Sequence, residues 1–308
     1  MKKLLAIIGL FSLLPFASFA QVLDGAFAHE HVAKREPIKL QYIRETDGMY
    51  AKRVLRFIDL DEKINHPLYF PIRPIDYPDT NKNGIAFQPN RKRVNLIELI
   101  YAEGLKRADD YNLTAFEFNP SDWTSWWAKE IEPNLLDSVL FFTAYEDYVD
   151  LNGITKTREK RVKINIMDVK SFIFWEEWVF DKQRSVMDVR IKAMAPVANA
   201  KYSVDKLQPD GTIIGMEREQ IARLFWIPFN DFRPLFASYE VFNTQNDAER
   251  RTFDDIFLKR RFSSYVIAES NNYDNRLIGD YLLGIDALRE GEYIQEKIFQ
   301  FEHDQWEY

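Results

Sequence analysis

The sequence contains no cysteine, little glycine and few histidines, and each shortage excludes a class of chemistry. Without cysteine the chain can form no disulfide bond, no cysteine nucleophile and no thiolate-bound zinc or iron–sulfur centre. Its 11 glycines include no G-x-x-x-x-G-K-[ST] or G-x-G-x-x-G loop that would hold a phosphate group. Its four histidines offer few metal ligands. These absences exclude several enzyme classes without defining a function.

The longest apolar run lies at the N-terminus and has the form of a secretory signal peptide. Lys2 and Lys3 precede an apolar stretch from Leu4 to Leu14, and residues 18–20 supply a small-x-small cleavage site. The stretch is too short to span a bilayer, and no later segment reaches about 18 uninterrupted apolar residues. We predict that residues 1–20 are a signal peptide and that the mature chain is exported without a transmembrane segment.

The charge of the chain narrows the classes of molecule that it can bind. The formal net charge is −7, and removal of the two signal-peptide lysines makes the mature chain more acidic still. Nucleic acid and bare anionic lipid are therefore poor partners. An exported chain without cysteine is typical of a bacterial periplasm or cell surface, and the lack of cysteine also excludes a lipid anchor at the mature N-terminus. We expect residues 21–39 to form an N-terminal arm and residues 40–308 a single domain.

Hydrophobic residues recur at helical spacing in three stretches, residues 47–60, 94–107 and 276–301, which we predict to be helices. The first has an apolar face made by Tyr50, Val54, Phe57 and Ile58. In the third, the face runs through Ile278, Tyr281, Leu282, Ile285, Leu288, Ile294, Ile298 and Phe301. A capping-box pattern at Thr252–Asp255 predicts a further short helix that ends near Arg261.

Alternating and aromatic-rich runs predict strands. The clearest are residues 171–180 and 186–198, separated by Asp-Lys-Gln-Arg-Ser, which we expect to form a hairpin. Residues 223–229 and 261–269 are two more predicted strands. The mixture of helices and hairpin strands indicates an α+β fold.

Turn-forming residues predict the connections. Residues 73–93 are a long loop, residues 108–134 are irregular with at most one short helix, and residues 198–219 are a loop that contains the turn at 208–211. We expect a short helical turn over residues 59–65, with Asp59 or Asp61 as its cap. Pro67 should end that turn and leave "PLYFPI" extended.

The segment "IDLDEKINHPLYFP", residues 58–71, poses the main choice between chemistry and structure. Asp59, Asp61, Glu62 and His66 could converge on a metal ion. However, the segment lacks the central glycine of a calcium loop, and a lysine lies among the carboxylates. We favour a turn in which the carboxylates cap helical residues.

Other candidate groups also favour structural interpretations. His29 and His31 could be two metal ligands, but two ligands alone make a weak site. Glu176 and Glu177 are adjacent on a predicted strand, so they point to opposite faces and cannot act as a facing pair of carboxylates. Ser263 and its neighbour lack the elbow motif of a serine nucleophile. We predict no catalytic residue, metal site or cofactor.

Two clusters leave a binding role open. "LKRRF", residues 258–262, is a basic run that suits either a helix C-terminus or an acidic partner, and we favour the helix end. "DWTSWW", residues 122–127, contains Trp123, Trp126 and Trp127, which could stack on a sugar. Clustered tryptophans are more often buried in a core or an interface.

Five blocks, taken in order, resemble the GldN/PorN family of gliding-motility proteins. They are residues 42–72, 94–105, 178–197, 224–243 and 252–281. The predicted loops between the first two blocks and after the second match the family poorly. The resemblance covers most of the mature chain and agrees with the signal peptide and the lack of cysteine.

The resemblance implies a non-enzymatic role in the type IX protein secretion system and in gliding motility. Family members associate with an outer-membrane lipoprotein of the GldK/PorK type to build a periplasmic ring. The ring is thought to couple to the periplasmic domain of a GldM/PorM-type motor. We therefore expect a periplasmic location at the inner face of the outer membrane.

A ring subunit needs complementary contact patches, and aromatic residues are enriched at such contacts. The aromatic blocks "PLYFP" and "LFWIPF" lead us to place Leu68, Tyr69, Phe70 and Trp226 at or beneath a partner contact. Ordinary core packing is the equal alternative for the first three. A carbohydrate- or peptidoglycan-binding module that uses the three tryptophans is the alternative function, and an unrecognised hydrolase is a third.

Overall fold

The computed structural model describes residues 35–71, 93–106, 113–119, 123–149, 155–207, 212–243, 246 and 249–306. Within these ranges the chain combines helices with antiparallel sheets, so the expected α+β class is confirmed. The predicted signal peptide, all of the predicted loop at 73–93 except its last residue, and most of the predicted N-terminal arm lie outside the described residues. Residues 35–39 of the arm contain no helix or strand.

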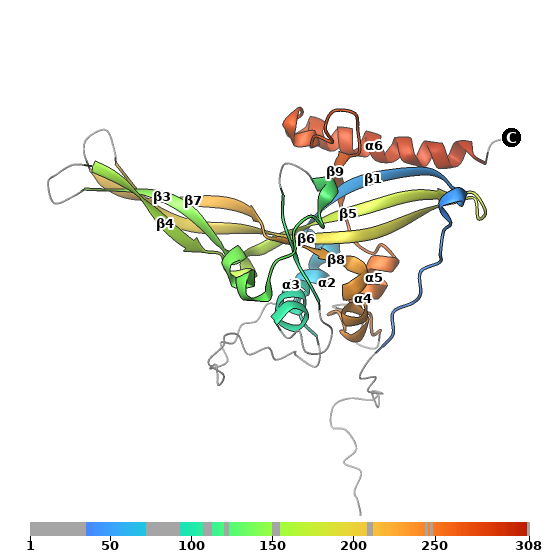
Figure 1. The fold of residues 1–308 in the computed structure, drawn as a ribbon, viewed down its shortest axis with the longest axis horizontal. Helices are drawn as coiled ribbons and strands as arrows, with labels where there is room; N and C mark the ends of the chain where they lie inside the picture. Colours follow the sequence, from blue (N-terminus) through green and yellow to red (C-terminus); the bar gives the residue numbers. More distant parts are fainter. Residues whose placement is uncertain are drawn as a thin grey trace, which may run out of the picture. The chain divides into compact units, whose positions relative to one another are not determined.

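A seven-stranded sheet forms the centre of the described fold, in the order β2–β8–β6–β5–β1–β9, with β7 paired to β6 off this path (Figure 1). Its strands are β1 Gly48–Asp59, β2 Phe116–Glu117, β5 Val169–Asp181, β6 Val186–Leu207, β7 Ile213–Arg223, β8 Phe225–Pro228 and β9 Tyr265–Glu269. A separate hairpin pairs β3 Phe141–Val149 with β4 Thr155–Lys163. All pairings between these strands are antiparallel.

The helices are mostly short. They are α2 His66–Tyr69, α3 Leu96–Glu98, α4 Phe229–Ser238, α5 Phe253–Leu258 and α6 Ile285–Asp304, and α3 continues as the π-helix η3 Leu99–Lys106. Single or double 3-10 turns occur at Glu45–Asp47, Lys63–Asn65, Trp123–Ser125, Pro133–Leu140, Ile166–Asp168 and Ile278–Asp280. No helix within the described ranges is both long and apolar enough to cross a bilayer.

The predicted hairpin at 171–198 is confirmed as β5 and β6. Phe172 and Phe174 lie in the main core beneath α4 and α5, whereas Ile173 and Trp175 lie in a second cluster on the other face. Strand alternation puts neighbouring residues on opposite faces, and here both faces are covered. The return strand β6 is 22 residues long and pairs with β5, β7 and β8 in turn.

Residues 47–60 are a strand, so the helix predicted there is wrong. β1 pairs with β5 on one side and with β9 on the other, and its second half is buried on both faces. A central strand of this kind has consecutive apolar residues, such as Val54 and Leu55, instead of strict alternation. The same four residues that fit a helical face therefore fit a doubly covered strand.

Two further predictions need correction. Residues 198–207 and 213–219 are strands of the β6–β7 hairpin, not parts of a loop, and the turn at 208–211 lies outside the described residues. Pro67 does not end a helical turn: it lies in the first turn of α2, where its missing N–H costs no hydrogen bond. The strand predicted at 223–229 is confirmed as β8, but Phe229 already begins α4, which was not predicted.

The local helix signals are confirmed more closely. Residues 94–107 contain α3 and η3, and Asn95 accepts the Glu98 N–H at 2.8 Å as the N-cap. The capping box at Thr252 and Asp255 is present at the start of α5. Where described, the region 108–134 contains strand β2, the 3-10 turn Trp123–Ser125 and the first two residues of the next one, Pro133–Leu140.

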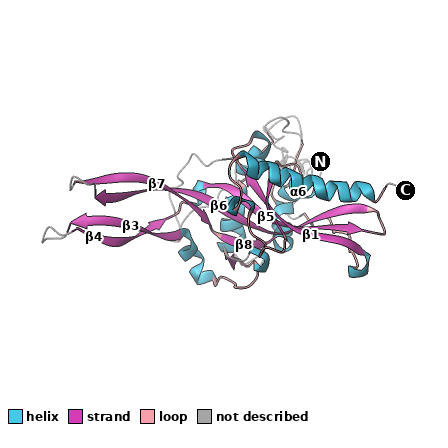
Figure 2. Ribbon diagram, turned by 90° about the horizontal axis from the view of Figure 1, so that it is seen from above, coloured by secondary structure: helices cyan, strands magenta, loops and turns pink. Residues whose placement is uncertain are grey.

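Helix α6 packs on β9, on the first half of β1 and on the second half of β5 (Figures 1 and 2). Ile294 and Ile298 are buried beneath it, and Phe301 stacks on Tyr50 with ring centroids 4.3 Å apart. Gly291 allows a close approach, because an added Cβ would lie 2.6 Å from the Val266 carbonyl oxygen. Of the predicted apolar face, Ile278, Leu282, Ile294 and Ile298 are therefore packed, whereas Tyr281, Ile285 and Leu288 are exposed.

The hairpin β3–β4 packs on the second half of β6. Phe142 meets Tyr202 edge to face with centroids 5.0 Å apart, and Lys160 Nζ donates to the Ser203 carbonyl at 3.0 Å. Since α6 contacts the start of β6 at Met187 and this hairpin covers part of the second half, the two ends of one strand have different neighbours.

Candidate interaction surfaces

The segment at 58–71 is fixed by a buried asparagine that sequence reasoning did not single out. Asn65 is fully buried, and its amide nitrogen donates to the carbonyls of Asp59 at 2.6 Å and Ser263 at 3.0 Å. Its side-chain oxygen accepts the Ser263 N–H at 2.9 Å. The bond to Asp59 is local and the two with Ser263 join distant parts of the chain, so Asn65 ties the end of β1 to the chain before β9.

The four predicted contact residues fall into two groups. Leu68 and Trp226 are buried in the core, and Trp226 stacks on Phe118 with ring centroids 5.2 Å apart. Tyr69 and Phe70 are half-buried, with their rings edge to face at 5.3 Å. Only the second pair can touch a partner directly, and the first pair can act only from beneath such a contact.

Tyr69 is held in place by a lysine on β5. Lys170 Nζ donates to the Tyr69 hydroxyl at 2.7 Å and lies 4.4 Å from the ring centroid. This hydrogen bond, followed by smaller charge contributions from Tyr69 and Asp61, raises the pKa of Lys170 above its ordinary value. The tyrosine therefore presents a fixed ring edge beside an ammonium group that also pairs with Asp61 at 3.5 Å.

The acidic residues of the same segment do not converge on a common point. Asp59 accepts the Asp61 N–H at 2.9 Å in a local turn, and the His66 ring lies 3.3 Å from the Asp61 carbonyl. Glu62 precedes the 3-10 turn without a capping bond, so the expected aspartate cap is wrong in detail. In the described parts of the chain no group of three His, Asp or Glu residues could hold a metal ion. His29 and His31 lie outside those parts.

Glu176 and Glu177 point to opposite faces, as predicted from their adjacency on a strand. Glu176 is fully buried, where it accepts hydrogen bonds from Arg260 at 2.9 and 3.2 Å and from the Trp178 indole at 3.0 Å. Glu177 pairs with Lys192 at 3.2 Å on the other side. These carboxylates are engaged in ion pairs and do not face each other across a cleft.

The basic run 258–262 closes over that buried carboxylate. Arg260 pairs with Glu176, and Arg261 pairs with Glu249 at 3.4 Å. Nearby, Arg56 donates to the Ser264 hydroxyl at 2.9 Å, which gives that serine a structural partner. The run follows α5 as expected, but Arg260 also serves to neutralise a core carboxylate.

The tryptophan cluster does not form a flat three-ring platform. Trp123 is buried and donates its indole N–H to the Asn275 carbonyl at 2.6 Å. Trp126 and Trp127 are perpendicular, with centroids 5.5 Å apart, and Trp127 is 51% exposed. Sugar stacking uses an exposed ring face, which only Trp127 offers to any extent. Asp122 lies outside the described residues.

The hairpin β3–β4 contains a shielded carboxylate. Glu146 is buried, and Lys160 Nζ and Arg158 Nη2 lie 2.9 and 2.6 Å from its oxygens. The hydrogen bonds from Lys160 and then from Arg158 hold the pKa of Glu146 below its ordinary value. Two positive charges of β4 are thus neutralised by Glu146 within the hairpin.

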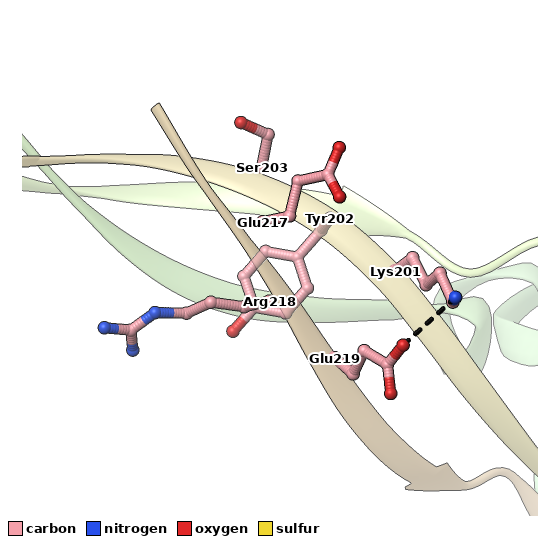
Figure 3. A pocket seen from close by; sticks show the side chains of 6 residues that line it. All are labelled: Lys201, Tyr202, Ser203, Glu217, Arg218 and Glu219. Atoms are coloured by element: carbon pink, nitrogen blue, oxygen red, sulfur yellow. Dashed lines mark ion pairs between the residues drawn. The ribbon is translucent and has the colours of Figure 1, made fainter. Parts of the chain in front are cut away.

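A shallow hollow lies on the β6–β7 hairpin. Figure 3 shows its lining residues, which are Lys201, Tyr202, Ser203, Glu217, Arg218 and Glu219. Lys201 and Glu219 form an ion pair at 3.1 Å. The hollow contains no histidine and no buried acid, so it resembles a contact surface more than a catalytic cleft.

A larger apolar patch lies around the start of α6. Its exposed residues are Tyr273, Tyr281, Leu283, Ile285 and Leu288. Arg276 lies between the two tyrosine rings, 4.9 and 4.3 Å from their centroids. Sequence reasoning placed Ile285 and Leu288 on the packed face, which is wrong, because the burial of α6 is confined to the face through Gly291, Ile294 and Ile298.

The fold and these surfaces define an α+β protein whose exposed apolar and aromatic residues suit contacts with other macromolecules. A family model described as "Gliding motility associated protein GldN" matches residues 43–307. The chain belongs to this family, and thus to the components of gliding motility and type IX secretion. No curated protein matches its sequence.

Proposed function

We propose that this chain is a non-enzymatic structural and adaptor subunit of the type IX secretion machinery. It forms a periplasmic ring with an outer-membrane lipoprotein of the GldK/PorK type and couples to the periplasmic domain of a GldM/PorM-type motor. The family match over residues 43–307 is the observation that carries the proposal. It spans nearly all of the described fold, including every strand of the central sheet.

The surface of the chain supports an assembly role. Large apolar side chains are exposed at several separate places, among them Leu283 at 82%, Tyr273 at 69% and Ile221 at 67%. Exposed apolar patches on a folded chain commonly mark sites of protein contact. The absence of cysteine denies the chain a lipid anchor of its own, so a lipoprotein partner accounts for its attachment to the outer membrane.

Tyr69 and Phe70 are the proposed direct contacts with that lipoprotein, supported from beneath by Leu68, which lies in the same core cluster as Tyr69. Trp226 lies in the cluster on the other face of the sheet, so it would support a separate contact there. The two half-buried rings stand next to Lys170, so the surface combines aromatic area with a positive charge. Such a combination of aromatic anchors and a charge that sets orientation is common in stable interfaces.

The contact is tested by replacing both rings with alanine and purifying the lipoprotein from detergent-solubilised envelopes. We expect the Tyr69→Ala/Phe70→Ala variant to fold, with unchanged circular dichroism, and to lose lipoprotein capture. The matched control is Tyr145→Ala on β3, whose side chain is 56% exposed. Normal capture by a normally folded double variant would show that these rings are not the contact.

The wider function is tested by deletion. A strain that lacks the chain should fail to secrete cargo proteins, and electron microscopy of the co-purified complex should show a ring. Undisturbed secretion in the deletion strain, or isolation of the chain as a monomer from intact envelopes, would overturn the proposed function.

A further inference from the structure

Residues 38–42 have the sequence pattern of a strand without a sheet to join. Ile38, Leu40 and Tyr42 alternate with Lys39 and Gln41, which is the period of a half-buried strand. In the structure these five residues form no helix or strand and are exposed, with the three apolar side chains at 66%, 37% and 83%. An apolar face with strand period therefore lies open to solvent.

The backbone of this segment is nevertheless held in place at two points. Arg233 Nη2 donates to the Ile38 carbonyl at 2.6 Å, and Arg190 Nη2 donates to the Gln41 carbonyl at 2.7 Å. Arg233 is itself fixed by Asp254, 2.8 and 3.1 Å away. Figure 1 shows the segment in blue, running without regular structure from the start of β1 toward α4. Bonds to two carbonyls leave the apolar side chains free for another contact.

The β7 strand is a sheet edge without a second neighbour among the described residues. It is 11 residues long and pairs only with β6. Residues 214–221 are all exposed, including Ile214 at 50%, Met216 at 39% and Ile221 at 67%. A long exposed edge with apolar side chains is a template for the addition of another strand.

The segment and this edge cannot meet within one copy of the chain. Gln41 is bound at Arg190, whereas Met216 of β7 lies opposite Val204. Arg190 and Val204 are fourteen positions apart on the continuous strand β6, which at about 3.3 Å per residue separates them by roughly 45 Å. Any contact between the two must therefore join different copies.

We propose that residues 38–42 of one copy add as an antiparallel strand to the free edge of β7 in a second copy. In the register we infer, Leu40 lies opposite Met216 and Tyr42 opposite Ile214, so the apolar residues share one face. On the other face Lys39 lies opposite Glu217. Neither Lys39 nor Glu217 has an ion pair within the described residues. Their opposite charges would therefore pair between copies without breaking an existing ion pair.

Each copy would then both donate a segment and accept one. A contact between two different patches is heterologous, and repetition of it gives a closed ring or an open filament. The inference rests on the proposed ring function and names the surfaces that would join neighbouring copies of this chain.

The lack of cysteine makes the register directly testable. The Leu40→Cys/Met216→Cys variant of the mature chain is oxidised in envelopes and separated on a non-reducing gel. Paired cysteines need Cα atoms about 4.4–6.8 Å apart, so we expect a ladder of covalent oligomers that collapses on reduction. Mixing two proteins that each contain one of these changes should give cross-linked dimers between the two types and no longer species.

The matched control is Leu40→Cys/Ile221→Cys, which places the second thiol on the same exposed strand but about 16 Å further along it. It should give no ladder above the level of the single variants. A charge test adds to this: Lys39→Glu should reduce cross-linking several-fold, and Glu217→Lys in the same chain should restore it.

Equal cross-linking of the two double variants, or none in either, would overturn the proposed strand addition. A photo-crosslinking residue can also be placed at position 40. If it captures the lipoprotein and not a second copy of this chain, the proposal that β7 of another copy binds the segment is overturned. If lipoprotein co-purification and secretion stay intact while no ladder forms, this inference fails and the proposed function stands. If secretion survives deletion of the chain, the proposed function fails whatever the gel shows.

Discussion

The ion pair between Arg233 and Asp254 supports a sharp prediction about stability. Both side chains are about nine-tenths or more buried, and two hydrogen bonds join them. In the Asp254→Ala variant the guanidinium stays buried and keeps only its bond to the Ile38 carbonyl. An unpaired buried charge costs about 3–5 kcal/mol. For a domain of this size that corresponds to a fall in melting temperature of roughly 10 °C.

The assay is urea unfolding followed by circular dichroism, with thermal melting as a second measurement. Asp286→Ala is the matched control: it also removes an acid from the first turn of a helix, but this acid is 71% exposed and lies 3.7 Å from Arg289. It should cost less than about 1 kcal/mol.

A comparison with a double variant, as in a double-mutant cycle, completes the test. The double variant Arg233→Met/Asp254→Leu removes both charges and should be more stable than Asp254→Ala alone, since no charge is left unpaired. A loss of less than about 1 kcal/mol in Asp254→Ala, or a double variant that is less stable than the single one, would refute the reasoning from burial.

Three other outcomes follow from the structure. Gly291→Ala would press a methyl group against the Val266 carbonyl and should destabilise by about 1–3 kcal/mol in urea unfolding; Gly279→Ala, which meets no atom within 4 Å, should not. The lowered pKa of Glu146 contributes stability above the ordinary glutamate pKa, and this is lost as pH falls through the lower folded-state value. Unfolding at pH 7 and pH 3.5 should therefore show a smaller loss on acidification for Glu146→Gln than for the unchanged chain. Finally, a pull-down on peptidoglycan should retain neither the unchanged chain nor Trp127→Ala, the variant of the exposed ring; retention that this change abolishes would support sugar binding.

The sequence predicted best those elements that are specified locally. The β5–β6 hairpin has alternating apolar residues on both strands, aromatic on β5, and the capping box of α5 lies within four residues. Neither depends on what packs above it. The helix predicted over β1 failed because Val54 and its neighbours are buried on both faces. A doubly covered strand and a buried helix look alike when only the spacing of apolar residues is known.

The candidate surfaces were less predictable, because exposure depends on tertiary contacts. Aromatic content singled out both Trp226 and Tyr69, yet one is wholly buried and the other half-buried. Conversely, the alternation at residues 38–42 was visible in the sequence but lay partly within a stretch taken as an irregular arm. Only the structure shows that two arginines hold it.

The uninterrupted course of β6 has a mechanical consequence. One end of this strand lies under α6 and the other end carries β7 and the β3–β4 hairpin. A pull exerted between those ends would run along peptide bonds, with the hydrogen bonds to β5 and β7 loaded in shear instead of being opened one by one. A subunit that is loaded between these two ends would gain resistance to stretching from such a continuous tie.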